Sequence, residues 1–160
     1  MLIESTGLPH APENLPSRVV WVGVVFGAAQ RLGGACAVLA HLARQRCRVA
    51  VYCPDTERFN HLDRLLWEYD SSHFVPHVEA GDPMGACTPL VLHRQPPPPE
   101  TPCVLNLADS ASSLPLAYPR VLEIVSADPS DLARGRAQWR YYQAAACELQ
   151  AFDLNRNQLP

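Results

Sequence analysis

An apolar, β-branched run at residues 18–26, followed at once by a helical pattern, constrains the fold more than any other feature. A run with so little polar alternation is typical of a strand buried on both faces. Residues 28–46 carry apolar side chains at three- and four-residue spacing, which predicts a helix packed on one side. A second apolar run follows at 48–53. This order favours two parallel strands joined by a right-handed crossover.

The same alternation continues toward the end of the chain. Asp55 is suited to cap a second helix, whose apolar stripe runs from Phe59 to Tyr69. Further segments are assigned as strands at 89–92, 103–107 and 121–125, a weak helix at 110–119 and a last helix at 129–149. The sequence therefore predicts an α/β fold: one three-layer domain with a mostly parallel sheet and helices on both faces.

The length of 160 residues suits one domain of ordinary size. We expect that domain to cover residues 18–150. Residues 1–17 contain three prolines and little periodicity, which predicts a flexible N-terminal arm. Residues 151–160 are expected to be a C-terminal tail. Four consecutive prolines at 96–99 predict a surface connection between two strands.

Composition excludes several classes of function. The net charge of −3 excludes a nucleic-acid clamp held by bulk positive charge. All thirteen basic residues are arginine, so no lysine is present for a P-loop or a Schiff base. Six cysteines lie outside any Cys-x-x-Cys motif, and Cys36 and Cys53 sit in apolar runs, which predicts free thiols in a reducing compartment. With neither a signal pattern nor a membrane-length apolar run, we expect a cytoplasmic protein without membrane contact.

Candidate catalytic and cofactor motifs are weak. The turn from Gly27 to Gly34 matches neither the dinucleotide fingerprint nor the P-loop. His73 and His77 are separated by Phe-Val-Pro, which opposes a helical metal pair. No nucleophile elbow is present to organise a catalytic triad. We therefore expect no metal and no cofactor, and a nucleotide-binding enzyme remains only an alternative.

The last helix carries the most specific chemical pattern. Within about a third of the helix circumference lie Leu132, Arg136, Trp139, Arg140 and Gln143. The small residues of the adjoining arc, expected to pack on the sheet, are Ala133, Ala137 and Ala144. Arginine forks beside an indole suit a peptide that carries carboxylates and an apolar side chain. The other interpretation, a solvated face with an internal cation–π contact, stays open from spacing alone.

Three stretches together carry a family resemblance: residues 47–55 leading into 62–67, then 72–77, then 135–142. In order and spacing they resemble the chi subunit family of bacterial DNA polymerase III, over residues 18–149. The resemblance implies a Rossmann-like α/β fold and a replication accessory subunit without catalytic activity. It also implies three partners: the acidic C-terminal tail of single-stranded-DNA-binding protein, the psi subunit and, in some members, a repair helicase. Direct DNA binding is not expected, and a helicase-associated repair adaptor is an alternative function.

The resemblance also implies a binding site for the acidic tail. Trp67, Phe74 and Val125 would supply its apolar wall. Arg136 would hold the terminal carboxylate of the tail, Trp139 would pack on its terminal aromatic ring, and Arg140 would attract the acidic residues upstream. Four features depart from the family: Leu132 replaces a residue that is often basic, the N-terminal arm is long, the proline loop is unusual, and prolines at 115 and 119 interrupt a segment that is more helical in relatives.

Overall fold

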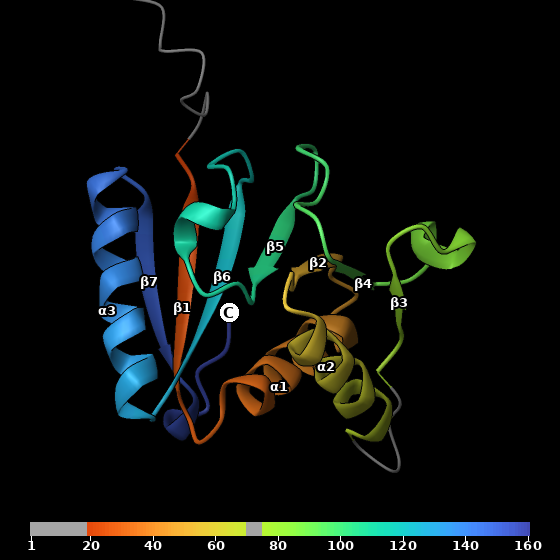
Figure 1. The fold of residues 1–160 in the computed structure, drawn as a ribbon, viewed down its shortest axis with the longest axis horizontal. Helices are drawn as coiled ribbons and strands as arrows, with labels where there is room; N and C mark the ends of the chain where they lie inside the picture. The colour runs from red at the N-terminus through yellow and green to blue at the C-terminus, as the bar shows by residue number, and fades with distance from the viewer. Residues whose placement is uncertain (1–18, 70–74) are drawn as a thin grey trace, which may run out of the picture.

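The computed structural model describes residues 19–69 and 75–160. Its centre is a seven-stranded sheet in the order β3-β4-β2-β5-β6-β1-β7, in which every strand pair is parallel (Figure 1). The strands are β1 Trp21–Ala28, β2 Val49–Tyr52, β3 His77–Glu79, β4 Leu90–His93, β5 Cys103–Asn106, β6 Arg120–Ser126 and β7 Glu148–Asp153. The prediction of an α/β domain with a mostly parallel sheet is confirmed.

Helices cover both faces of the sheet and complete three layers (Figure 1). One face packs against α1, Arg31–Arg44, and α2, Thr56–Glu68, in one apolar core. The other face packs against α3, Pro129–Ala144, and the short 3-10 turn η3, Ala111–Ser113, in a second core. The Rossmann-like sandwich expected from the sequence is therefore present.

The predicted strand at 18–26 is observed as β1, and its apolar character follows from its two neighbours. It pairs with β6 on one side and β7 on the other. Val22 and Val25 have no exposed surface and contribute to the opposite cores. Helix α1 crosses closely over this strand, because a Cβ at Gly34 would lie only 2.7 Å from the Cβ of Ala28.

Helix α2 begins as the sequence predicts. The Asp55 carboxylate caps it by accepting a 2.8 Å hydrogen bond from the backbone N–H of Arg58. Phe59, Leu62 and Leu66 form its buried stripe. The stripe is shorter than expected, because the helix ends at Glu68 and the Tyr69 side chain is 40% exposed.

The C-terminal part differs from the expectation. Helix α3 ends at Ala144 instead of residue 149, and Glu148–Asp153 forms strand β7 along the edge of β1. The expected tail at 151–160 therefore begins inside the sheet. Helix propensity at 145–147 does not prevail, because the open edge of β1 offers hydrogen bonds such as the 2.9 Å bond from the N–H of Glu148 to the carbonyl of Val20.

Two further differences concern short elements. The weak helix expected at 110–119 is reduced to the 3-10 turn η3, because prolines at 115 and 119 cannot continue a helix. The three-residue strand β3 lies in a segment that looks irregular in sequence, since its pattern is too short to show alternation. The N-terminal arm expected at 1–17 lies outside the described residues.

The cysteines are all free thiols. Burial raises the pKa of Cys36, Cys53 and Cys103 to about 11, so these three act as small apolar core residues. Among the described ranges, 19–69 and 75–160, no helix is long and apolar enough to cross a membrane.

Candidate functional site

The outer face of α3 is a candidate binding surface, and the way the helix is seated on the sheet defines it. Asp128 caps the helix by accepting a 2.9 Å hydrogen bond from the N–H of Ser130. Gly135 lies directly over β6, where an added Cβ would be 2.8 Å from both methyl carbons of Val125. The close approach buries Val125 to 5% exposure. Val125 therefore supports the helix from below.

The buried side of α3 is partly polar. It consists of Gly135, Gln138 and Tyr142. The hydroxyl of Tyr142 donates a 2.6 Å hydrogen bond to Oε1 of Glu123 on β6, and Asn106 donates one of 2.8 Å to the same oxygen. Because Glu123 is fully buried, the pKa of its carboxyl is raised, although these hydrogen bonds oppose the shift.

The expectation that Ala133, Ala137 and Ala144 pack on the sheet is wrong. All three are exposed. The helix turns Tyr142 inward, because Glu123 on the sheet accepts a hydrogen bond from its hydroxyl, and Gln138 inward, where its Oε1 accepts a 2.7 Å hydrogen bond from Arg134 of the same helix. Polarity alone assigns such residues to the solvent side, which explains the error.

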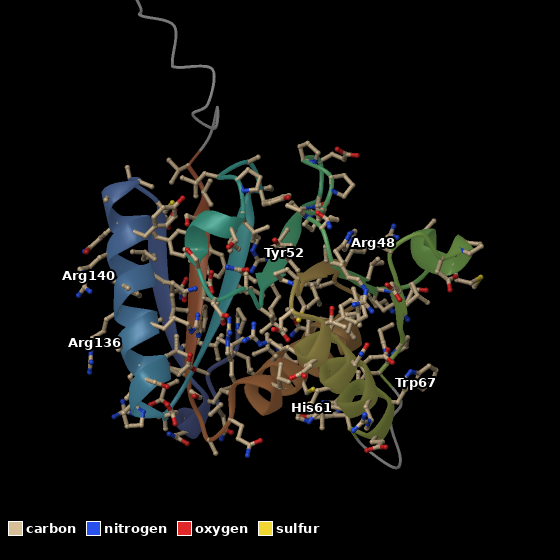
Figure 2. All side chains as sticks on the ribbon, in the orientation of Figure 1. Arg48, Tyr52, His61, Trp67, Arg136 and Arg140 are labelled. Atoms are coloured by element: carbon tan, nitrogen blue, oxygen red, sulfur yellow. The ribbon has the colours of Figure 1, made fainter. Side chains whose placement is uncertain are left out.

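Arg136 and Arg140 project from the solvent side of α3, well away from the sheet (Figure 2). Trp139 is half-buried and packs, with Leu132, against the edge of the core under the helix. Within the described part of the chain, no hydrogen bond or ion pair engages either guanidinium. The face thus presents two arginines one turn apart beside an indole.

The interpretation of this face as an internal cation–π cluster is not what the described residues show. The guanidinium groups stacked on rings are those of Arg94, 3.8 Å from the centroid of Phe59, and Arg120, 4.7 Å from that of Trp21. Both lie outside α3. Arg136 and Arg140 are therefore available to an external ligand.

Trp67 lies on a different surface from α3. Its ring packs edge-to-face on His77 of β3, with centroids 5.1 Å apart, and its side chain is 57% exposed. Strands β3 and β6 are four positions apart in the sheet, about 19 Å at the usual strand spacing. Figure 2 shows Trp67 and Arg136 on opposite sides of the molecule. The structure thus brings Arg136, Trp139 and Arg140 together and leaves Trp67 apart, while Phe74 lies outside the described residues.

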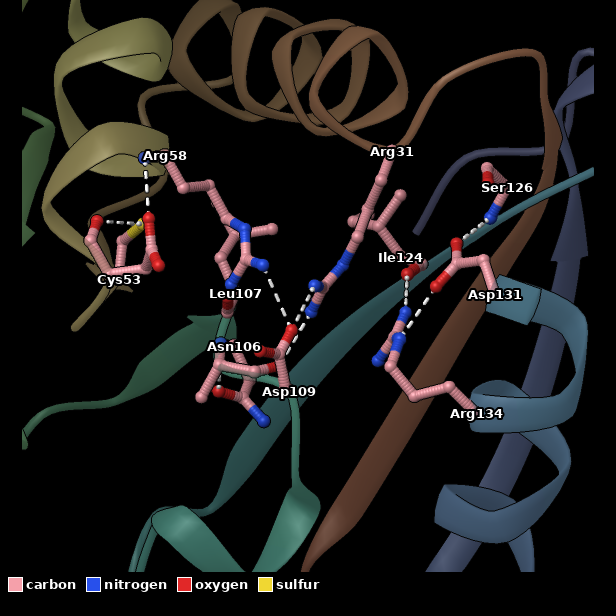
Figure 3. A network of polar contacts seen from close by, with 12 residues as sticks. Arg31, Cys53, Arg58, Asn106, Leu107, Asp109, Ile124, Ser126, Asp131 and Arg134 are labelled. Atoms are coloured by element: carbon pink, nitrogen blue, oxygen red, sulfur yellow. Dashed lines mark hydrogen bonds and ion pairs between the residues drawn. The ribbon is translucent and has the colours of Figure 1, made fainter. Parts of the chain in front are cut away.

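A second concentration of charge lies at the carboxyl ends of β5 and β6, where Figure 3 shows a polar network. Arg31 and Arg58 approach the same oxygen of Asp109, at 3.5 and 2.9 Å. Arg134 pairs with Asp131 at 2.6 Å and donates to the carbonyl of Ile124 at 2.8 Å. These residues line a pocket of about 390 Å³. Sequence reasoning missed this pocket, because its arginines come from three separate segments and form no motif.

The turn at Gly27 does not offer room for a dinucleotide. Gly27 has a positive φ of 96°, and an added Cβ would lie 2.8 Å from the carboxylate of Asp153 and 3.0 Å from the amide nitrogen of Asn155. Side chains at the end of β7 and just after it therefore occupy the space where a pyrophosphate would approach. This geometry weighs against the nucleotide-binding alternative.

Three comparisons bear on the whole chain. Residues 19–150 match the family model described as DNA polymerase III chi subunit, HolC. A curated relative, DNA polymerase III subunit chi of Pseudomonas aeruginosa, is 29% identical over 126 residues, which cover 79% of this chain and 88% of that protein. The crystal structure of T4 UvsW matches with a TM-score of 0.58 at 6% identity, over 84% of this chain and 41% of that one. The last match shows a shared fold only, with this chain spanning less than half of that protein.

Proposed function

The chain belongs to the DNA polymerase III chi subunit family, and from that premise we propose that α3 binds the acidic C-terminal tail of single-stranded-DNA-binding protein. Family membership gives the chain a role in DNA replication as an accessory subunit. In the proposed function it has no catalytic step of its own. It links the clamp-loader assembly to protein-coated single-stranded DNA.

One observation carries the proposal: Arg136 and Arg140 are exposed and unpaired among the described residues, with the half-buried Trp139 beside them. Guanidinium groups bind carboxylates through two parallel hydrogen bonds. We assign the terminal carboxylate of the tail to Arg136, its terminal aromatic ring to Trp139, and its upstream acidic residues to Arg140. A local pair of arginines is sufficient for this on a protein of net charge −3.

The six residues implied by the family resemblance contribute unequally in this proposal. Arg136, Trp139 and Arg140 contact the tail, and Val125 acts through packing under α3. Trp67 lies near the other edge of the sheet and is not required for the tail. Substitution of Trp67 therefore distinguishes two models of the site: one confined to α3, and one that includes all six residues.

Titration with a synthetic peptide ending in Asp-Asp-Asp-Ile-Pro-Phe tests the proposal, with heat or tryptophan fluorescence as the readout. The control peptide lacks the terminal Phe. We expect saturable binding of the full peptide alone, about micromolar in dissociation constant, weakened by salt because exposed charges are screened. Equal behaviour of both peptides, or no binding by folded protein at low salt, would contradict the proposal.

The psi subunit and a repair helicase are further proposed partners. Which of them associates with the protein distinguishes a role in replication from a role in repair. Recovery of clamp-loader subunits with the protein from native cells would support the replication link. Recovery of a helicase without any clamp-loader subunit would support the alternative function as a repair adaptor. Arg136→Ala should leave either association intact if it uses a separate surface.

A further inference from the structure

We infer that the pocket at the carboxyl ends of β5 and β6 binds a phosphate group, held by Arg31 and Arg58 and attracted by Arg134. The pocket lies between the first residues of α1, the first turn of α2 and the start of α3, with a volume of about 390 Å³. The site is distinct from the outer face of α3 and does not depend on the proposed tail binding.

The convergence of two guanidinium groups on one oxygen is the geometric basis of the inference. Nη2 of Arg58 lies 2.9 Å and Nη1 of Arg31 lies 3.5 Å from Oδ1 of Asp109 (Figure 3). The backbone fixes both arginines from behind, because Arg58 donates to the carbonyl of Leu107 and Arg31 to that of Ala108, each at 2.7 Å. An oxyanion in the pocket would meet donors that are already positioned.

Donor capacity remains after these contacts. A guanidinium has five N–H groups, and Nε of Arg31 is buried without a hydrogen-bond partner among the described residues. A buried donor without a partner costs free energy, so the Arg31 guanidinium is held in the pocket with its hydrogen-bonding capacity not fully used. The Arg31 side chain is 12% exposed and that of Arg58 is 23% exposed, so both act in a medium less polar than water.

The buried charges of the pocket have a positive excess. Its cations are Arg31, Arg58 and Arg134, and its acids are Asp109, Asp128 and Asp131. The Asp109 side chain is 74% exposed, and Asp128 is engaged at the cap of α3. Only Asp131, 13% exposed and paired with Arg134, is a largely buried carboxylate. Among the lining residues, three partly buried guanidinium groups thus face one buried carboxylate, and Glu123, whose raised pKa disfavours its charged form, is buried nearby.

The mutual repulsion of these cations is visible at Arg31. Burial, together with the positive charges of Arg134 and Arg58, lowers the pKa of Arg31 to about 10, although the carboxylates of Glu123 and Asp131 oppose the shift. An added anion would reduce this repulsion. Asp109 supplies part of that charge, but from a side chain that lies mostly in solvent.

The position of the pocket in the topology fits a ligand site. Strands β1 and β6 are neighbours, yet the helix after β1 covers one face of the sheet and the helix after β6 covers the other. In open parallel sheets, ligands bind in the crevice that opens at such a switch in direction. Arg31 and Leu32 come soon after β1, and Ser126 is the last residue of β6. All three line the same crevice.

The lining selects the phosphate group itself over a whole nucleotide. Leu32 is the one apolar side chain among the lining residues, and no aromatic ring lines the pocket, so a base has no surface to stack on. The Ser130 hydroxyl already donates to Asp128, so the donors offered to a ligand are those of the guanidinium groups. The ligand chemistry is therefore a phosphate monoester or inorganic phosphate, either free or at the 5′ end of a DNA strand.

Thermal unfolding in inorganic phosphate, with chloride at matched ionic strength as reference, is the first test. A ligand that binds only the folded protein raises its Tm in a saturable way. We expect that rise with phosphate and not with chloride. Equal Tm values in the two salts would overturn the inference.

Two variants with opposite expected signs separate binding from folding defects. Asp109→Asn removes an exposed competitor of the ligand and should tighten phosphate binding about two- to fivefold. Arg58→Gln should weaken it about tenfold or more, because a charged hydrogen bond is lost. Arg64→Gln, an exposed arginine on the same helix, is the matched control and should bind phosphate as the unmodified protein does. If Asp109→Asn leaves the affinity unchanged, the site is not in this pocket.

The source of the phosphate is resolved by a pair of oligonucleotides that differ only in a 5′ phosphate. Binding of the phosphorylated strand alone, lost in Arg58→Gln, would assign the pocket to a DNA end. Binding of inorganic phosphate with no preference between the strands would assign it to a free phosphate. Arg58→Gln should bind the acidic peptide normally, so failure of either proposal is recognised independently of the other.

Discussion

The hydroxyl of Tyr142 donates a 2.6 Å hydrogen bond to Oε1 of Glu123 and so joins α3 to the centre of β6. Glu123 has no exposed surface. The orientation of the outer face of α3, with Arg136 and Arg140, therefore depends on a buried polar contact as well as on apolar packing.

Replacing Glu123 with glutamine should flatten the dependence of stability on pH. Burial raises the pKa of Glu123 in the folded protein. When the pKa of an acid is raised on folding, its contribution to stability is fully present below its pKa in the unfolded chain, about 4.3. That contribution is lost as pH rises through its pKa in the folded protein. Urea unfolding should be measured for both proteins from about pH 4.5 to about pH 8, which lies above the unfolded pKa. The free energy of unfolding should fall more steeply with rising pH in the unmodified protein. Parallel curves would contradict this origin of the pH dependence.

Tyr142→Phe should destabilise the fold by about 1–3 kcal/mol, because Glu123 loses one of its two hydrogen-bond donors in a buried site. The ring itself is retained, so packing is little changed. Urea unfolding at fixed pH measures the effect. Tyr141→Phe, at a half-buried neighbour without a described hydrogen bond, is the control and should change the free energy of unfolding much less.

Substitutions on α3 should separate the proposed tail contacts. Arg136→Ala and Trp139→Ala should each weaken binding of the acidic peptide about tenfold or more, as expected for charged and aromatic anchor residues. Arg140→Ala should chiefly reduce the dependence of affinity on salt. Calorimetric titration checks each variant.

Trp67→Ala and Arg64→Ala are the matched controls, since both side chains are exposed on α2, away from α3. Both variants should retain peptide affinity. A loss in Trp67→Ala equal to that in Trp139→Ala would show that the tail contacts both surfaces.

Gly135→Ala should destabilise the protein by about 1–3 kcal/mol, the usual cost of overpacking. The added methyl group would lie 2.8 Å from both methyl carbons of Val125. In a Val125→Ala background the same change should become nearly neutral, because the obstructing groups are gone and alanine favours the helix. Thermal unfolding of the two single variants and the double variant measures this coupling. Simple addition of the two single effects would disprove the contact.

The order of the helices and long strands could be predicted from the sequence, because β1 is a continuous apolar run, α1 and α2 carry apolar stripes, and α3 begins with a capping residue and a proline. The helix cap at Asp55 could also be predicted, since its hydrogen bond is made to a residue three positions away. Strand β7 could not be predicted, because its pairing is decided by the distant edge of β1 and not by its own mixed residues. Long-range pairing thus overrides local propensity there.

The candidate site was predicted in part for a similar reason. Helical spacing brings Arg136, Trp139 and Arg140 to one side of α3, and the structure has them so. Helical spacing cannot report that Trp67 is held at β3 through His77. Nor can it show Arg31 and Arg58 meeting at Asp109, which requires the ends of separate elements to converge.

The position of β7 has a practical consequence for any shortened version of the protein. The family match ends at residue 150, whereas β7 continues to Asp153 and is followed by the 3-10 turn Leu154–Arg156. A chain cut at the family boundary would lose half of that strand and leave the carboxyl half of β1 with unpaired backbone groups. Exposed strand edges pair with other chains. Residues 151–153, beyond the end of the recognised family region, thus cover residues 24–26 of β1, and a shortened protein should retain them.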